Sequence, residues 1–524
     1  MWALNAGGYR RLGAAGSVAA AAGGWVAGTL PDREPWGLWM PHGSAVTVAG
    51  AVLAYVGLTL LVVAWWRYGR AGASTRDTLV TLVWWATPLA LAPPLYSADV
   101  YSYIAQGAMV LEGHDVYGAG PSVLDPAGLG GDAAASVGAN WTDAPAPYGP
   151  FFLILARGVT WATGGTIVPA VLGMRLIAVG ALVLIVWALR RLARERGTSE
   201  SGALWLGALN PLLLMHVIGG MHNDGLMIGL MLAGVVLALR GRWIAAGALV
   251  GLAMMVKSPA AMALLFIGVF VGRAATGTLA RRVAKGVAPG LVAVAVAVAA
   301  ALLGGTGFGW LRTQSVAGTI HTALSATSDL GLGLGELLHL LVGTDPGPVK
   351  AAVQDLGLGA ALVLIAYLAW RTVRASPDVA RASAPARAVG TARAADSARA
   401  VNTVRAADAD SASERARPLD PVHALGMALL ALVALSPMVQ PWYLLWGMTV
   451  IAATTPYGRT GTVLTVLSAA LVYETHPSGA TPWYGFVLAV VACVIGTLLV
   501  RRDRNAPVEV PAPTEGLAVG AHRT

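Results

Sequence analysis

The chain has 524 residues, of which 56% are hydrophobic and only 12% are charged. Soluble domains carry about 25% charged residues, so this composition excludes an ordinary soluble enzyme and indicates a membrane protein with many spans. The formal net charge is +9. The arginines and lysines nevertheless lie in short segments between apolar stretches, where they set membrane topology rather than bind nucleic acid. The one cysteine, Cys493, lies in an apolar run, which argues against disulfides and cysteine metal sites.

The apolar stretches predict an all-α polytopic membrane protein with about 14 transmembrane helices, because a span needs roughly 20 apolar residues. Shorter stretches can still cross where flanking side chains reach the interface. The N-terminal stretch lacks a convincing cleavage site and is interpreted as the first span. The predicted spans are 12–30, 44–66, 78–95, 167–189, 202–218, 223–239, 243–256, 259–272, 284–304, 349–371, 420–437, 439–455, 460–475 and 481–500.

Arginine clusters between the spans orient the chain through the positive-inside rule. Arg10 places the N-terminus in the cytoplasm, and the arginines of 190–196 then also fall inside. This orientation requires that the apolar stretch 148–163 lies along the outer surface as an interfacial helix. The sequence therefore predicts a multi-pass plasma membrane protein with both termini in the cytoplasm and a first large outer loop at 96–166.

Composition divides the chain into four parts. An N-terminal membrane block covers residues 1–371, and a second membrane block of four helices covers 419–504. Between them, segment 372–418 is rich in Ala, Arg, Ser and Asp and poor in large apolar residues. Such a segment cannot bury a core, so it is predicted to be a disordered cytoplasmic loop. The tail 505–524 contains Pro and Gly and is predicted to be disordered as well.

The unusual polar residues gather on the predicted outer face. Nucleotide sugars and nucleoside triphosphates are absent there, and the sequence contains no phosphate-binding loop motif. Chemistry on this face would therefore use a donor that a carrier lipid presents at the membrane surface. The outer segments that carry these polar residues are 96–166, 219–224, 257–259, 305–348 and 436–443.

Five short motifs in these segments are LYSADVYSY at 95–103, HDVY at 114–117, APYGP at 146–150, GMHND at 220–224 and PWY at 441–443. Together they resemble the actinobacterial polyprenol-phosphomannose-dependent α-1,6-mannosyltransferases, which belong to the GT-C class of integral membrane glycosyltransferases. The resemblance extends from about residue 80 to 500 and includes an aspartate in the first large outer loop, followed by interfacial helices. The loop 372–418 is not part of it and is interpreted as a lineage-specific insertion.

The resemblance implies transfer of mannose from polyprenyl-phosphate mannose to an α-1,6-mannan acceptor of the lipomannan type in the cell envelope. A β-linked donor and an α-linked product make the reaction inverting, so one base must deprotonate the attacking hydroxyl. Asp99 is the predicted catalytic base, because carboxylates near the bilayer are costly and usually functional. The same aspartate could instead cap an interfacial helix.

The departing lipid phosphate requires cations where negative charge develops. Lys257 is the first candidate, because it interrupts an apolar hairpin on the predicted outer side. Arg175 and Arg312 are further candidates for binding the donor phosphate. Lys257 could also be a side chain that reaches the interface from a helix end, and Arg175 could be an interface anchor.

Residues of the same motifs are predicted to bind the donor or acceptor sugar. The triplet 222–224 could contact a sugar, bind a divalent cation together with Asp99, or cap the helix that begins there. No cofactor is predicted to be required, although a divalent cation remains possible. The aromatic residues could stack on sugars or belong to an interfacial belt. The predicted sugar-binding set is Tyr101, Tyr103, Asp143, Tyr148, His222, Asn223, Asp224, Gln440, Trp442 and Tyr443.

A transporter or flippase of a lipid-linked sugar is the main alternative function. Transporters tend to show internal repeats and broken helices near the membrane midplane, whereas this chain gathers its polar residues at one outer face. A structural scaffold would leave Asp99 and the 222–224 triplet without a role. Another lipid-linked sugar, such as glucose or arabinose, is compatible with the same residues.

Overall fold

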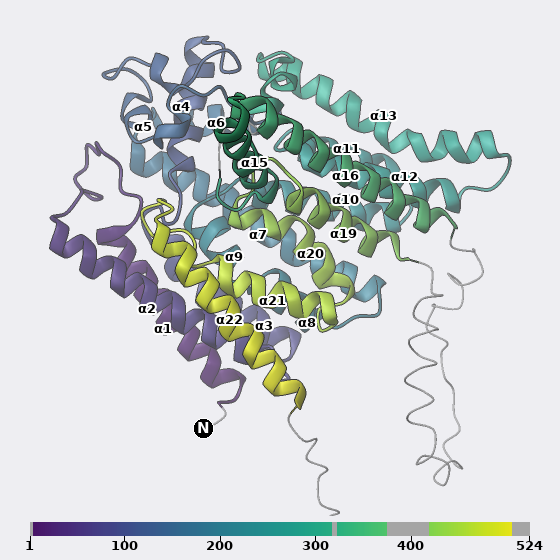
Figure 1. Cartoon of the computed structure of the whole chain (residues 1–524), viewed down its shortest axis with the longest axis horizontal. Helices are drawn as coiled ribbons and strands as arrows, with labels where there is room; N and C mark the ends of the chain where they lie inside the picture. The colour runs from purple at the N-terminus through teal and green to yellow at the C-terminus, as the bar shows by residue number, and fades with distance from the viewer. Residues whose placement is uncertain (1–3, 317–321, 375–418, 506–524) are drawn as a thin grey trace, which may run out of the picture.

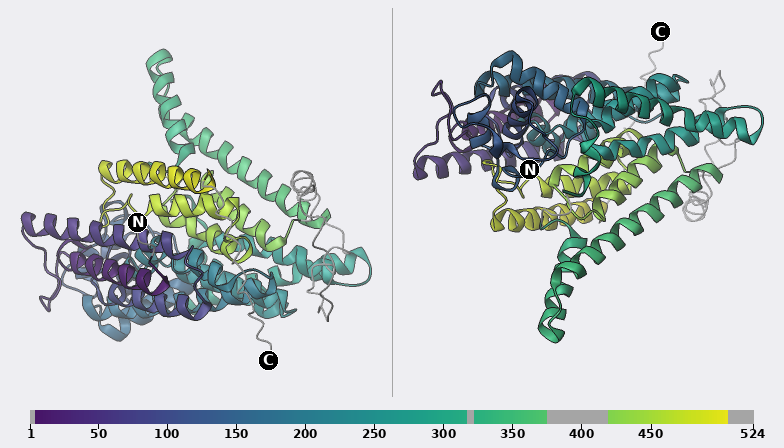
Figure 2. Two further views of the ribbon diagram at one scale, coloured as in Figure 1. Left: turned by 90° about the horizontal axis from the view of Figure 1, so that it is seen from below. Right: turned by 90° about the horizontal axis from the view of Figure 1, so that it is seen from above.

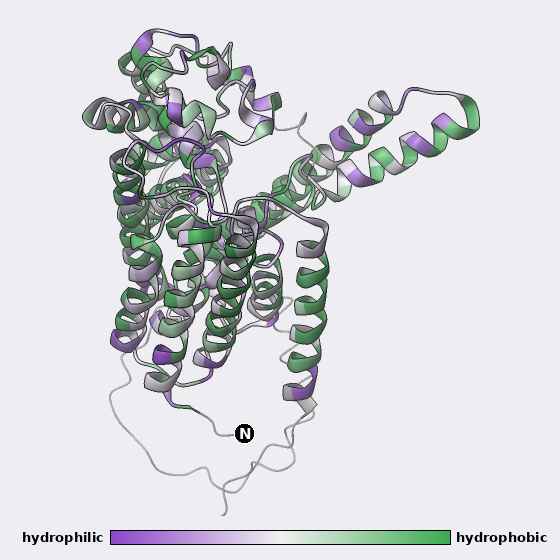
Figure 3. Ribbon diagram, turned by 90° about the vertical axis from the view of Figure 1, so that its left-hand side faces the viewer, coloured by the Kyte–Doolittle hydropathy of each residue, from purple (hydrophilic) through white to green (hydrophobic). Residues whose placement is uncertain are grey.

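The computed structural model describes residues 4–316, 322–374 and 419–505, and these residues form helices and connecting segments without a strand (Figure 1). The predicted disordered loop and tail therefore lie almost wholly outside the described residues. Figure 3 shows hydrophobic residues along the upright helices and hydrophilic residues mainly near helix ends. This distribution is typical of a multi-pass membrane protein.

Five of the described helices are long and apolar enough to cross a membrane. A sixth span results if α8 and the following helix, which are bent by 49° at their junction, are counted as one. The predicted count of about 14 depends on shorter apolar helices, below the roughly 20 residues that span a bilayer, and it stays a prediction. The five are α2 (Ser44–Tyr68), α7 (Ile167–Glu195), α13 (Leu279–Gly304), α16 (Pro346–Arg374) and α22 (Trp483–Asn505).

The other helices are shorter or less apolar and include the one that begins with Asp99. The predicted helix at 148–163 is present as α6, although its placement in a membrane interface stays a prediction. These helices are α1 (Ala6–Ala27), α3 (Thr75–Leu91), α4 (Asp99–Glu112), α5 (Gly131–Ala135), α6 (Pro150–Thr163), α8 (Glu200–Gly207), α9 (Pro211–Leu213), α10 (Asp224–Leu239), α11 (Trp243–Met254), α12 (Met262–Ala274), α15 (Ala326–Val342), α19 (Pro421–Ala434), α20 (Leu444–Thr454) and α21 (Arg459–Leu471). One- and two-turn helices are η1 (Pro121–Val123), η2 (Ala139–Trp141), η3 (Leu214–Gly219), η4 (Ser258–Ala261), η5 (Gly309–Leu311), η6 (Thr313–Ser315) and η7 (Pro441–Tyr443).

Small residues allow α1 and α2 to approach closely. A Cβ added at Gly16 would lie 2.6 Å from the carbonyl oxygen of Gly57, and one added at Gly23 would lie 2.4 Å from that of Gly50. Small residues at matching positions are the usual way in which membrane helices bring their backbones together. The chain just after α1 contacts the segment that leads to Asp99, because the N of Thr29 donates to the carbonyl oxygen of Pro94 at 2.9 Å.

The span predicted at 202–218 is broken in the structure. α8 ends at Gly207, and the buried Asn210 then caps the next turn by accepting a hydrogen bond from the backbone N of Leu212 at 2.8 Å. A π-helical turn, η3, follows directly and ends at Gly219. Such turns occur frequently at functional sites, and this one leads into the GMHND motif.

The C-terminal half of the described chain packs against the N-terminal half. Figure 2 shows the green helices α15 and α16 extending away from the body, and α16 then returns to it. Gly331 and Gly335 of α15 lie against Lys350 and Pro346 of α16, where an added Cβ would lie within 3 Å of backbone atoms. The returning part of α16 contacts α19 and α12 and forms one wall of the cavity described below.

Candidate functional site

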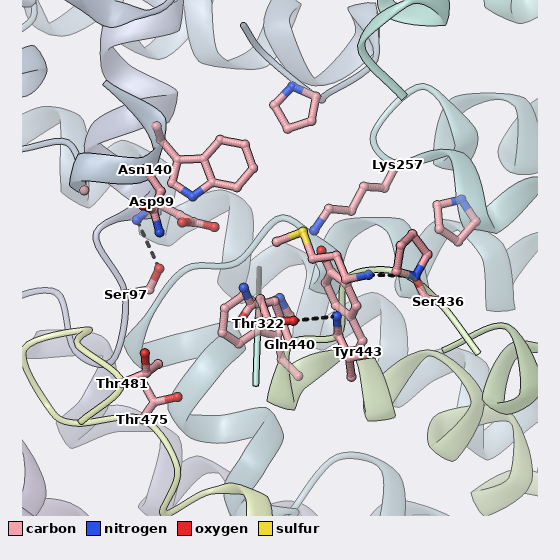
Figure 4. Close-up of a pocket in the computed structure, with 18 of the residues that line it drawn as sticks. Ser97, Asp99, Asn140, Lys257, Thr322, Ser436, Gln440, Tyr443, Thr475 and Thr481 are labelled. Atoms are coloured by element: carbon pink, nitrogen blue, oxygen red, sulfur yellow. Dashed lines mark hydrogen bonds between the residues drawn. The ribbon is translucent and has the colours of Figure 1, made fainter. Parts of the chain in front are cut away.

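A cavity of about 1120 Å³ lies where the loop after α3, the turn before η4, α16 and the C-terminal helices meet (Figure 4). Its wall combines charged and amide side chains with aromatic rings. This mixture suits a polar ligand such as a sugar, which needs hydrogen-bond partners for its hydroxyls and apolar surface for its ring face. The charged and amide residues of the wall are Asp99, Asn140, Lys257, Gln314, Gln354, Asp355, Gln440 and Glu474.

Backbone hydrogen bonds from two distant segments fix the chain just before Asp99. The N of Leu95 donates to the carbonyl oxygen of Gly219 at 3.1 Å, and the N of Tyr96 donates to that of Pro477 at 2.9 Å. Tyr96 has a φ of 63°, in the left-handed region. A non-glycine residue there costs about 1–3 kcal/mol and persists only where its surroundings enforce it. The segment is therefore held in one conformation by parts of the chain more than a hundred residues away.

Asp99 is the first residue of α4, a position where the helix dipole favours a negative charge. Its backbone N donates to Oγ of Ser97 at 3.0 Å. The carboxylate does not cap the helix, because Ala98 is the N-cap residue and its side chain makes no capping hydrogen bond. Instead, Nδ1 of His222 lies 3.0 Å from Oδ2 of Asp99, and the hydroxyl of Tyr103 donates to the same oxygen at 3.3 Å. The alternative reading of Asp99 as a helix cap is thus not supported by the geometry.

The neighbours of Asp99 keep its carboxylate charged. Burial raises the pKa of Asp99, but the electrostatic interaction and hydrogen bond with His222, the charge of Lys257 and the hydrogen bond from Tyr103 together outweigh burial, and the pKa lies below its usual range. The Asp99 side chain is 21% exposed toward the cavity, whereas that of His222 is fully buried. The ring of His222 stacks on Trp442, with 3.7 Å between the centroids. Asp99 thus presents an ionised carboxylate on a fixed support.

A second cluster lies around Lys257. Its Nζ donates to Oδ2 of Asp224 at 2.7 Å, and Nε1 of Trp446 donates to Oδ1 of the same carboxylate at 2.7 Å. Nζ also lies 5.0 Å from the ring centroid of Tyr443 and 5.9 Å from that of Tyr148. Burial lowers the pKa of Lys257, but the charge of Asp224, its hydrogen bond with the ammonium and the nearby Tyr443 and Asp99 together outweigh burial and raise the pKa to about 12. Lys257 is therefore a fixed cation on the cavity wall.

The structure brings many of the predicted site residues to this cavity. Asp99, Lys257, Tyr148, Gln440, Trp442 and Tyr443 line it. Tyr103 and His222 lie directly behind Asp99 and hold its Oδ2. Asn223 is 4% exposed, and its backbone N donates to the hydroxyl of Tyr103 at 3.3 Å. Asp224 is completely buried behind Lys257.

Besides Tyr103 and the triplet 222–224 behind the wall, four further predicted residues do not line the cavity. Arg175 is buried in α7 and donates to the carbonyl oxygen of Leu89, and the hydroxyl of Tyr101 donates to that of Thr29 at 2.6 Å. Asp143 and Arg312 are exposed and are absent from the residues that line the cavity. The structure therefore gives Arg175 and Tyr101 partners inside the protein rather than a face on the cavity.

The arrangement does not offer an evident metal site. Asp99 and Asp224 were the predicted carboxylate pair, but both oxygens of Asp224 already accept hydrogen bonds from Lys257 and Trp446. Across the described residues, no group of three or more His, Cys, Asp or Glu side chains is placed to hold a metal ion. Asp224 is thus not free to pair with Asp99 around a cation, and the expectation that no metal is required stays a prediction. The positive charge on the wall comes from Lys257.

Two functional positions were missed from the sequence. Trp446 fixes Asp224, and nothing but its place one turn after Tyr443 could have indicated this. Glu474 lines the cavity from the C-terminal block, yet the predicted span 460–475 included it. α21 ends at Leu471, so this glutamate lies in the connection between two helices. A carboxylate inside a predicted span was itself a signal of function that the sequence offered.

Comparisons with known proteins match both parts of the chain that contribute residues to the site. Residues 10–273 match the family described as alpha-(1->6)-mannopyranosyltransferase, N-terminal domain, and residues 410–502 match the MptB C-terminal domain. The first range contains Asp99, His222 and Lys257, and the second contains Trp442 and Glu474.

Proteins from three actinobacteria are similar to this chain. A probable alpha-(1->6)-mannopyranosyltransferase of Mycolicibacterium smegmatis is 32% identical over 94% of this chain and 87% of its own length. The alpha-(1->6)-mannopyranosyltransferase B of Corynebacterium glutamicum is 30% identical over 85% of this chain and 72% of its own. The alpha-(1->6)-mannopyranosyltransferase A of Mycobacterium tuberculosis is 41% identical over half of this chain and 51% of its own length.

Proposed function

The chain belongs to the alpha-(1->6)-mannopyranosyltransferase family, and we propose that it transfers mannose from polyprenyl-phosphate mannose to the 6-hydroxyl of an α-1,6-mannan acceptor. One observation carries the proposal beyond the family name. A carboxylate, Asp99, and a cation, Lys257, face the same cavity and are each fixed by separate buried partners. A base for a hydroxyl and a counter-charge for a phosphate are what such a transfer needs.

Asp99 is the general base in this proposal. His222 and Tyr103 both engage Oδ2, which leaves Oδ1 available to the cavity. The acceptor hydroxyl gives its proton to Oδ1 as its oxygen forms a bond to the anomeric carbon of the donor mannose. The bond between that carbon and the phosphate oxygen breaks on the opposite face, and its electron pair leaves with the lipid phosphate. A β-linked donor thus becomes an α-linked product.

Lys257 provides the charge that stabilises the departing phosphate. A preorganised cation in a site of low water content is worth far more to a developing anion than the same cation in water. The buried carboxylate of Asp224 and the ring of Tyr443 hold the ammonium without covering it, since Lys257 still lines the cavity. Trp442, Tyr443 and Tyr148 supply apolar surface around the sugar.

The topology that suits this reaction places the cavity on the outer face of the plasma membrane, with both termini in the cytoplasm. The arginine clusters at the opposite ends of the spans support this orientation. α10, α11, α12, α19 and α21 are apolar helices of 12–16 residues that would supply crossings beyond the five long ones if the count approaches 14. On this topology α6 lies in the outer interface.

The proposal is tested by turnover of a labelled donor. Purified protein should transfer labelled mannose from polyprenyl-phosphate mannose to an α-1,6-mannobioside, and it should not use GDP-mannose. The use of polyprenyl-phosphate glucose or arabinose in place of mannose would contradict the donor assignment. Transfer from GDP-mannose would contradict the requirement for a lipid carrier.

A flippase of a lipid-linked sugar is the second candidate. The 49° break between α8 and the following helix favours it, because transporters build their sites from broken helices. The cavity favours chemistry instead, because acidic side chains and the ammonium of Lys257 line it. Protein in vesicles that moves the labelled donor across the bilayer without forming a mannoside would support the flippase.

A further inference from the structure

The connection between α21 and α22 carries a polar surface that the proposed reaction has not used. Glu474, Thr475, Ser478 and Thr481 of this connection all line the cavity. We name residues 474–481 the C-terminal loop. Glu474 is only 3% exposed, so its carboxyl group is buried among protein atoms except where it faces the cavity. A buried carboxyl group with little access to water is costly unless something binds it.

The C-terminal loop is fixed against the segment that carries Asp99. The carbonyl oxygen of Pro477 accepts from the N of Tyr96 at 2.9 Å and from Oγ1 of Thr29 at 3.3 Å. Gly479 has a φ of +82°, and a Cβ added there would lie 3.2 Å from Cα of Ser97. Only glycine combines this conformation with so close an approach. The loop and the Asp99 segment therefore form one continuous wall.

The carboxyl group of Glu474 has an oxygen to offer a ligand. Its Oε2 accepts from Oγ1 of the adjacent Thr475 at 2.9 Å. Its Oε1 has no hydrogen-bond partner among the described residues. This oxygen is nevertheless not fully buried. A carboxylate oxygen and nearby hydroxyls are suitable partners for the hydroxyls of a sugar.

The position of the loop indicates which sugar it would contact. Figure 4 shows Thr475 and Thr481 on the side of Ser97 and Asp99, away from Lys257. In an inverting displacement the attacking oxygen and the leaving phosphate lie on opposite faces of the donor sugar. With Lys257 at the phosphate, the acceptor must approach from the opposite side, which is the side of the C-terminal loop.

We propose that the C-terminal loop is the acceptor subsite, in which Glu474 and the hydroxyls of Thr475 and Thr481 bind hydroxyl groups of the acceptor mannoside. This inference rests on the proposed function for the identity of the sugar and on Lys257 for the direction of approach. It assigns donor and acceptor recognition to different parts of the chain. The N-terminal block holds the phosphate, and the C-terminal block holds the acceptor.

Steady-state kinetics of Glu474→Gln separates acceptor binding from donor binding. The variant should raise the KM for α-1,6-mannobioside about tenfold, because an oxygen that accepts from an acceptor hydroxyl is replaced by an NH2 group. The KM for polyprenyl-phosphate mannose should stay within about twofold, since no contact near Lys257 changes. Glu34→Gln is the matched control. Glu34 is a buried carboxylate that accepts from the N atoms of Trp36 and Leu38 and does not line the cavity.

An unchanged acceptor KM in Glu474→Gln, or an equal rise in both KM values, would overturn the subsite. If Glu474→Gln does not fold, Thr481→Ala on the same wall takes its place with the same expected pattern. Binding of α-1,6-mannobioside without donor, measured by saturation-transfer NMR, keeps this test apart from the proposed reaction. If wild-type protein binds the mannoside but does not turn over the mannosyl donor, and Glu474→Gln loses this binding, the result contradicts the reaction and supports the subsite. No binding to wild-type protein would overturn the subsite.

Discussion

The side chain of Asp224 is completely buried, and its carboxylate lies 2.7 Å from Nζ of Lys257, which faces the cavity. Its second oxygen accepts from Nε1 of Trp446, also at 2.7 Å. A buried carboxylate with both oxygens satisfied is a support for its partner rather than a ligand for substrate. The cation that faces the cavity is therefore positioned by a residue that substrate does not reach.

Asp224→Asn should destabilise the protein and weaken its use of the donor. Removal of one partner from a buried ion pair leaves an uncompensated charge and costs of the order of 3 kcal/mol. Thermal denaturation in detergent measures this loss, and the KM for the lipid donor measures the displacement of Lys257. Asp77→Asn is the control, because Asp77 pairs with Arg10 at a half-exposed position. Equal shifts in melting temperature for the two variants would contradict the role of Asp224.

Lys257→Ala should lower kcat/KM for polyprenyl-phosphate mannose about a hundredfold, because a preorganised charge at the departing phosphate is lost. Lys257→Arg should restore part of the activity, since the positive charge returns with a different shape. Arg312→Ala serves as the control, because Arg312 is exposed and does not line the cavity. A rate for Lys257→Ala close to that of the wild type would show that Lys257 is only structural.

The pairing of Asp99 with His222 predicts how activity depends on pH. Burial raises the pKa of Asp99, but His222 and Lys257 lower it further, so the base stays deprotonated into the acid range. The acid limb of kcat/KM for the wild type should therefore fall below the ordinary aspartate pKa of about 4. His222→Gln should move this limb to higher pH, because burial is then opposed only by the charge of Lys257 and the hydrogen bond from Tyr103.

His423→Gln is the control for this profile, since His423 of α19 contacts Thr454 and does not line the cavity. Its acid limb should coincide with that of the wild type. The same lowered pKa makes Asp99 stabilise the fold above the pKa of the unfolded chain, and this stabilisation is lost as pH falls through the folded value. A His222→Gln limb that does not move, or that moves to lower pH, would contradict the assignment.

Chelation should leave turnover unchanged. The two oxygens of Asp224 are occupied by Lys257 and Trp446, so a divalent cation has no carboxylate pair to bind. EDTA titration of the purified enzyme with a defined lipid donor checks this expectation. Loss of activity that Mg²⁺ or Mn²⁺ restores would show that the phosphate needs a metal and that Lys257 is insufficient.

The sequence predicted much of the site because its motifs flank breaks between apolar stretches. Asp99, Lys257 and Trp442 come from three such breaks and meet at one cavity. The roles within the GMHND motif could not be predicted, because they depend on backbone geometry. Met221 has a φ of 53° after a π-helical turn, and from this point His222 contacts Asp99 whereas Asp224 contacts Lys257.

The remaining differences between the sequence-based predictions and the structure have similar physical causes. Arg175 looked like an interface residue near a helix end, but it is buried and donates to the carbonyl oxygen of Leu89 in α3. Trp65 and Trp205 are buried between helices, and each donates to the other's backbone oxygen at 2.9 Å. Hydropathy alone does not distinguish a lipid-facing residue from one packed between helices. For the same reason, the number of short helices that cross the membrane stays a prediction.

The most direct test of the account is mannosyl transfer by Asp99→Asn. Wild-type protein, Asp99→Asn and the control Asp125→Asn are each given labelled polyprenyl-phosphate mannose and α-1,6-mannobioside. Asp125 is exposed and accepts from the N of Ala127 away from the cavity wall. We expect product from the wild type and the control, and at least about a hundredfold less from Asp99→Asn, with donor binding retained. Product from Asp99→Asn at the wild-type rate would contradict the central role of Asp99.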